Sequence, residues 1–83
     1  MNFGDFLVQY LQNTLELPEY GEVKMEVTID QGGHLTHLQI LDSKSEKNAQ
    51  FLKNRLPTLP FPCLNDFDIF EMKQTFTITF KNA

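Results

Sequence analysis

The chain has 83 residues, of which 41% are hydrophobic and 22% are charged, so one small globular domain over residues 1–83 is expected. Eleven acidic and seven basic residues give a formal net charge of −4, which disfavours binding to nucleic-acid phosphates and to anionic membrane surfaces. A single cysteine excludes an intrachain disulfide, and no apolar run approaches the ~20 residues that span a bilayer.

The first predicted element is an amphipathic helix over Asn2 to Leu17. Its apolar residues recur at spacings of three and four, the period of one helix face. These residues are Phe3, Phe6, Leu7, Tyr10, Leu11 and Leu15. Pro18 and the following Tyr20-Gly21 end the helix, because proline disfavours the helical conformation in the residue before it. The apolar stripe predicts that this helix covers another element.

A β-hairpin is predicted next, because the apolar period changes from helical to two. Glu22 to Asp30 carries apolar residues at every second position, and the Gln31–Gly33 segment supplies the glycines of a turn. The second strand, about His34 to Leu41, has one odd step between Leu35 and Leu38. A bulge near Thr36-His37 would restore the alternation.

The second half of the chain predicts a helix, an irregular segment and a final strand. The helix runs from Glu46 to Leu56, with Ser43 or Ser45 as its cap, and Pro57 ends it. The segment that follows contains three prolines, yet its apolar residues Phe61, Leu64 and Phe67 predict that it is packed. In the last strand one face consists of Met72, Phe76, Ile78 and Phe80, and the other consists of Lys73, Thr75, Thr77 and Thr79.

This order predicts an α+β fold, a two-layer sandwich with the order helix, strand, strand, helix, strand. Each strand has one apolar face and each helix one apolar stripe, so both helices are expected on one face of a three-stranded antiparallel sheet. The strand directions require the order 2-1-3, which places the last strand at an edge of the sheet.

The free edge of the last strand is the predicted binding site. Unpaired backbone groups on an edge strand can accept a further strand from another chain, a mode known as β-augmentation. The site residues are Lys73, Thr75, Thr77 and Thr79, and the backbone is expected to matter more than their side chains. Protection of the edge by its lysines, or dimerisation through it, is the alternative that the residues leave open.

No catalytic, metal or cofactor site is predicted from the titratable residues. His34 and His37 are three apart, so they face opposite sides of a regular strand and share a metal only if the bulge reunites them. Cys63 has no local base to lower its pKa and is expected to pack as a small apolar residue. The carboxylates of Asp66 and Asp68 are expected to be exposed to solvent. Gly32-Gly33 is predicted to be a hairpin turn, and the sequence contains no glycine-rich phosphate-binding loop.

The pattern from Gly21 onward resembles the C-terminal domain of the TonB/TolA family. The residues that carry the resemblance are Gly21, Val23, Met25, Val27, Ile29 and Asp30, then Gly33, Leu35, Leu38, Ile40 and Ser43, then Ala49 and Leu52, the prolines Pro57, Pro60 and Pro62, and the closing Phe76, Ile78 and Phe80. The leading helix, with Tyr10 and the exit Leu15 to Pro18, is more similar to the TolA branch. The chain departs from many relatives at Asn48, where they carry an acidic residue, and in its lack of tryptophan and of a cysteine pair.

The resemblance implies a non-catalytic periplasmic domain of an inner-membrane-anchored, energy-transducing protein. Such a domain docks periplasmic or outer-membrane partners, often by strand addition at its third strand, and transmits force from a complex driven by the proton-motive force. Neither nucleic acid nor a small-molecule substrate is implied. The targeting segment and the linker would then lie upstream of this chain.

Two other function classes compete with this interpretation. A small acidic cytosolic chaperone or adaptor that holds a secretion substrate would suit the acidic balance and the absence of an export signal from this sequence. A small hydrolase or metal protein would require a polar pocket lined by His34, His37 and Asp66.

Overall fold

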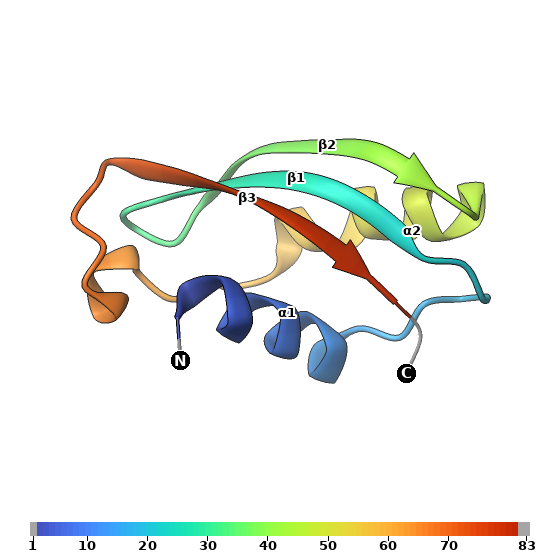
Figure 1. The fold of residues 1–83 in the computed structure, drawn as a ribbon, viewed down its shortest axis with the longest axis horizontal. Coiled ribbons are helices and arrows are strands. Elements are labelled where there is room, and N and C mark those ends of the chain that lie inside the picture. The colour runs from blue at the N-terminus through green and yellow to red at the C-terminus, as the bar shows by residue number, and fades with distance from the viewer. Residues whose placement is uncertain (1, 82–83) are drawn as a thin grey trace.

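The computed structural model describes residues 2–81 and contains a three-stranded antiparallel sheet with two helices packed on one face (Figure 1). The elements in chain order are α1 (Phe3–Thr14), β1 (Val23–Asp30), β2 (Leu35–Ser43), α2 (Glu46–Arg55) and β3 (Lys73–Phe80). Two short 3-10 helices, η1 (Leu56–Thr58) and η2 (Leu64–Phe67), lie between α2 and β3. The strand order is β2-β1-β3, so the predicted fold class and topology are confirmed.

Both helices begin at side-chain caps. The Asn2 side chain accepts a hydrogen bond from the Asp5 N–H at 2.8 Å, and the Ser45 hydroxyl accepts one from the Asn48 N–H at 3.1 Å. The helix predicted to reach Leu17 ends three residues earlier, at Thr14, because Leu15 is already extended. Leu15 and Leu17 are nevertheless buried, so the extended exit still places both side chains in the core.

The core lies between the inner face of the sheet and the two helices. Leucines and Phe3 from α1 meet the inward side chains of β1, together with Leu52 from α2 and Leu64 from η2. The segment of three prolines is packed as predicted, because Leu64 is fully buried and Phe61 and Phe67 contact the core. Among the described residues, no helix is long and apolar enough to cross a membrane.

One residue of the predicted apolar face of the last strand lies outside the core. Met72 precedes β3 and its side chain is 82% exposed, whereas Ile78 and Phe80 on the same predicted face are 3% exposed. The reason is that α1 covers the later part of β3 but does not extend to the end where the strand begins (Figure 1). Met72 was grouped with this apolar face, but its side chain is not part of the core.

The two neighbours of β1 pair with it differently. β3 pairs with β1 in an unbroken register from Asp30–Lys73 to Val23–Phe80. The register between β2 and β1 shifts twice, because Thr36 and Leu41 have no partner residue on β1 and each forms a β-bulge. The bulge at Thr36 confirms the one predicted near Thr36-His37, and the bulge at Leu41 was not predicted.

Candidate functional site

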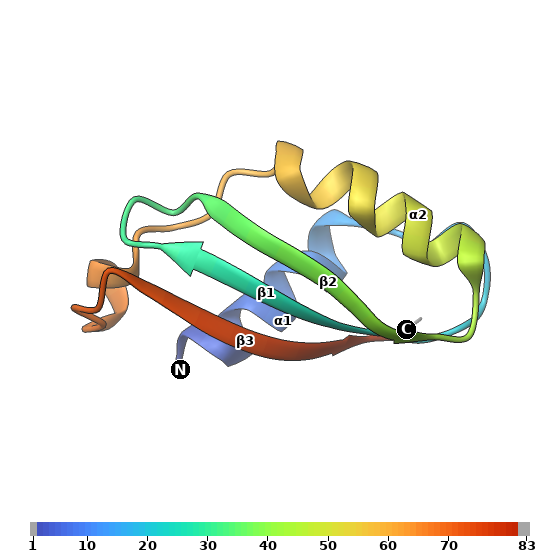
Figure 2. The same ribbon diagram turned by 90° about the horizontal axis from the view of Figure 1, so that it is seen from above.

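The outer edge of β3 is a free edge among the described residues. Figure 2 shows β3 as one margin of the sheet, with β1 on its inner side and α1 beneath the sheet. The opposite margin is β2, and α2 lies alongside it (Figure 2). The sheet therefore offers two edges, and the geometry of each decides whether another strand could pair with it.

The hydrogen bonding before β3 shows which of its backbone groups face outward. The Gln31 N–H donates to the Met72 carbonyl at 3.0 Å. Gln31 and Met72 are therefore a hydrogen-bonded pair, and the backbone groups of Met72 point toward β1. In an antiparallel ladder, bonded and non-bonded pairs alternate. The bonds from β3 to β1 therefore come from Gln74, Phe76, Ile78 and Phe80, and the N–H and C=O groups of Lys73, Thr75, Thr77 and Thr79 face the free edge.

The four predicted site residues thus combine outward backbone groups with exposed side chains. Lys73, Thr75, Thr77 and Thr79 are all exposed, whereas the alternate residues point toward the helices and are half-buried or buried. The structure brings the four together along one unbroken edge. A strand added here would find a donor and an acceptor at every second residue, which is the spacing that β-augmentation uses.

The β2 edge is poorly suited to the same role. Its two bulges, at Thr36 and Leu41, interrupt the spacing of its outward groups and twist the strand locally. Natural sheets use such bulges to prevent pairing at exposed edges. β3 has an unbroken register with β1, so β3 is the edge that remains competent for strand addition.

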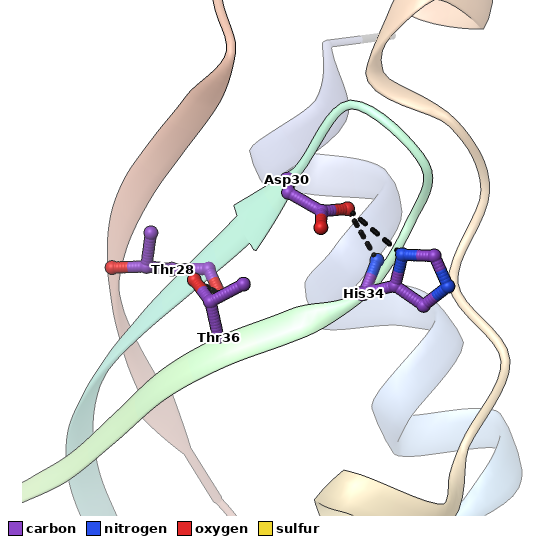
Figure 3. A network of polar contacts seen from close by, with 4 residues as sticks. All are labelled: Thr28, Asp30, His34 and Thr36. Carbon is purple, nitrogen blue, oxygen red and sulfur yellow. Dashed lines mark hydrogen bonds and ion pairs between the residues drawn. The ribbon is translucent and has the colours of Figure 1, made fainter.

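The face of the sheet that the helices leave open carries a polar network near the hairpin. The Thr28 and Thr75 hydroxyls are 2.8 Å apart across β1 and β3, and the Thr36 hydroxyl donates to the Thr28 carbonyl at 3.3 Å. At the hairpin the Asp30 carboxylate accepts the His34 N–H at 2.9 Å and lies 3.2 Å from His34 Nδ1 (Figure 3). The backbone N–H of His34, with the imidazole as a smaller contribution, holds the pKa of Asp30 below its ordinary value.

The two histidines do not form a common site. His34 pairs with Asp30, and His37 Nε2 lies 3.4 Å from Glu26 Oε1. The described residues contain no group of three or more His, Cys, Asp or Glu side chains placed to hold a metal. A depression of about 320 Å³ near the hairpin includes His34 among its lining residues, but neither His37 nor Asp66. The polar pocket that a hydrolase or metal protein would require is therefore not formed by these three residues.

The expectation that Cys63 packs as a small apolar residue was wrong. Its side chain is exposed, whereas the next residue, Leu64, is fully buried. The backbone of Cys63 is extended just before η2, so the side chains of Cys63 and Leu64 point in opposite directions. Because the Leu64 side chain points into the core, the Cys63 side chain points to the surface. Asp66 and Asp68 are exposed as expected, and Asp68 adopts a left-handed conformation (φ 59°) where η2 ends.

Sequence reasoning missed one feature at each edge of the sheet. Phe70 and Met72, just before β3, are 71% and 82% exposed. The Leu41 bulge had a visible signal, because the adjacent Ile40 and Leu41 break the alternation of β2.

The comparisons with known proteins gave no match: no family model, no curated protein and no solved structure matches this chain.

Proposed function

We propose that this chain is a non-catalytic protein-interaction domain of a cell-envelope, energy-transducing protein of the TonB/TolA kind. It docks periplasmic or outer-membrane proteins by strand addition at β3, and the inner-membrane complex acts through a part of the protein upstream of this chain. The support is the resemblance in the sequence, which implies strand addition at the third strand, together with the position of β3 at an edge of the sheet.

The observation that carries the proposal is the contrast between the two sheet edges. β3 presents the outward backbone groups of four successive alternate residues, and β2 is interrupted by bulges at Thr36 and Leu41. When a partner strand that has been added to β3 is pulled in the direction of the edge, the force is shared by many backbone hydrogen bonds at once. That loading suits a domain that must hold its partner under force without a large apolar interface.

The test uses one substitution that removes an outward N–H and a matched one that keeps it. Thr77 is exposed and its N–H faces the free edge, so Thr77→Pro removes a donor without breaking the ladder to β1. Thr77→Val keeps the donor and closely matches the side-chain shape. The immobilised wild-type domain and both variants are incubated with envelope and cytosolic extracts, and captured proteins are identified by mass spectrometry.

We expect wild type and Thr77→Val to enrich the same periplasmic or outer-membrane proteins, and Thr77→Pro to lose them while its circular dichroism remains that of a folded domain. NMR titration with a captured protein should then shift the amides of residues 73–81. Unchanged capture by folded Thr77→Pro contradicts the edge model. Enrichment of cytosolic secretion substrates alone would favour a chaperone or adaptor.

A further inference from the structure

We infer that the strand received by β3 is asymmetric in its chemistry: it carries a bulky apolar side chain at the end beside Met72 and acidic side chains at the end beside Lys81. This inference rests on the proposed function, because it names the partner chemistry of the same edge. It adds to the predicted site two flanking subsites, one apolar and one cationic.

The apolar subsite consists of Phe70 and Met72. Their side chains are 71% and 82% exposed, although large apolar side chains are normally removed from water. Gln31 holds the backbone of both residues, because its N–H donates to the Met72 carbonyl at 3.0 Å and its side-chain amide donates to the Phe70 carbonyl at 3.4 Å. The two exposed side chains are therefore presented by an anchored segment.

The position of Met72 determines which side chain of the partner would meet it. The Met72 carbonyl faces β1. The carbonyls of Gln74, Phe76, Ile78 and Phe80, whose side chains point toward the helices, face β1 as well. Met72 thus continues the inner row just before β3, but its side chain is 82% exposed. A partner strand along β3 has its own inner row at this end, and an apolar side chain in that row would cover Met72.

The cationic subsite lies at the other end of β3, on the open face. Lys24 is the cross-strand neighbour of Thr79, and Lys81 follows Thr79 by two residues. Both lysines are exposed, and neither has an ion pair among residues 2–81. An acidic side chain opposite Thr79 or Lys81 would lie on the same face as both ammonium groups.

The charges along the rest of the edge favour this orientation over its reverse. Glu26 and Asp30, the acidic neighbours of β3 on β1, each have a histidine partner, at 3.4 Å and 3.2 Å. Lys73 at the first end has two acidic residues near it, its cross-strand neighbour Asp30 and the exposed Glu71 beside Met72. The other end has two lysines and one acidic cross-strand neighbour, Asp42, which is opposite Lys24 on β2. An acidic side chain would be repelled by Glu71 at the apolar end and attracted by Lys24 and Lys81 at the other.

The length of the occupant follows from the strand rise. The segment from Met72 to Lys81 spans roughly 30 Å at about 3.3 Å per residue. An extended partner segment of about ten residues therefore reaches both subsites.

The test uses two terminally blocked peptides of about that length, with threonine at most positions. One has leucine at its first position and glutamates at the two positions that fall beside Thr79 and Lys81. The other has the reversed sequence, so both strand directions are covered. Affinity is measured by NMR titration, with the amides of Thr75, Thr77 and Thr79 as reporters.

Two sets of variants probe the subsites separately. Met72→Ser removes the apolar contact, and Leu41→Ser, an exposed leucine on the far edge, is its control. The double variant Lys24→Glu, Lys81→Glu reverses the charge of the cationic subsite. A peptide with lysines in place of its two glutamates restores the attraction to this variant. All four positions are exposed, so the fold is expected to tolerate these changes.

We expect one of the two peptides to shift the three reporter amides. Met72→Ser should weaken its binding by about fivefold or more, with Leu41→Ser unchanged. The double charge reversal should weaken it by about 2- to 30-fold, and the lysine peptide should recover binding to that variant.

Three results would overturn the inference. If the peptides shift the β3 amides but none of the variants changes the affinity, the edge accepts strands without these subsites, and the proposed function stands alone. If no peptide shifts β3, both the inference and strand addition at this edge fail. If the β3 amides shift with protein concentration and no peptide competes, a second copy of the chain occupies the edge.

Discussion

Asn48 is expected to be the most sensitive polar residue of the fold. It lies on α2 with a fully buried side chain, and its amide bridges to the segment between α1 and β1. The amide oxygen accepts the Glu19 N–H at 3.2 Å, and the amide nitrogen donates to the Glu19 carbonyl at 2.9 Å and to the Gly21 carbonyl at 2.8 Å. One side chain thus holds the exit of α1 against the start of α2.

The magnitude follows from these three bonds. A buried hydrogen bond contributes about 1 kcal/mol net, and a buried polar group that loses its partner costs about 1–3 kcal/mol. Asn48→Ala should therefore lower the free energy of unfolding by roughly 3 kcal/mol. A domain of this length has a total of roughly 4–12 kcal/mol, so the variant should lose a large fraction of its stability.

Asn48→Asp separates the loss of donors from the loss of volume. Aspartate keeps the shape and can accept the Glu19 N–H, but its ionised form cannot donate to the carbonyls of Glu19 and Gly21. Burial beside these carbonyls would raise the pKa of the new carboxyl in the folded state. Because a raised pKa means that the folded state binds more protons, the destabilisation relative to wild type should grow as pH rises above the unfolded pKa of about 3.9.

Urea unfolding followed by far-UV circular dichroism measures both variants, with wild type measured at the same pH values. We expect unchanged m-values and lower midpoints, with Asn48→Asp closest to wild type at low pH. A loss of less than about 1 kcal/mol for Asn48→Ala would refute the assignment of three stabilising bonds to this amide. An Asn48→Asp variant as stable as wild type at neutral pH would refute the role of the two donated bonds.

Two further predictions concern the hairpin. Gly33→Ala should cost about 2 kcal/mol or more in thermal or urea unfolding, because Gly33 has φ +82° and an added Cβ would lie 2.3 Å from the Phe61 carbonyl oxygen. Gly32→Ala is the matched control: its Cβ would meet the movable His34 ring at 3.0 Å and Asp30 Oδ1 at an ordinary contact distance of 3.6 Å, so an equal loss there would contradict the argument. The lowered pKa of Asp30 predicts a stabilising contribution that is present above the unfolded pKa of about 3.9 and lost as pH falls through the lower folded value. Thermal unfolding of Asp30→Asn should therefore depend less steeply on pH in this acidic range than that of wild type, and parallel curves would disprove the linkage.

Local periodicity was sufficient to predict the fold, because each element has one apolar face and the strand directions permit few sheet orders. The alternation in β1 predicted its buried face, and the odd step between Leu35 and Leu38 predicted the bulge at Thr36. What local patterns could not predict depends on where other elements end. Met72 continues an apolar row but extends past α1, and Cys63 is turned outward by the burial of Leu64. The burial of Asn48 depends on the path of the chain through Glu19 to Gly21, which α2 alone does not specify.

The contrast between the two edges follows from a difference in their alternation. In β3 the residues whose side chains face the helices are also those whose backbone groups pair with β1. The outward donors and acceptors therefore belong to Lys73, Thr75, Thr77 and Thr79, whose side chains the core does not need. In β2 the extra residues at Thr36 and Leu41 break this correspondence, so no comparable continuous row of outward groups forms there. Substitutions along the outer row of β3 can consequently alter pairing with another strand while the core remains intact, which is the property that makes the edge testable.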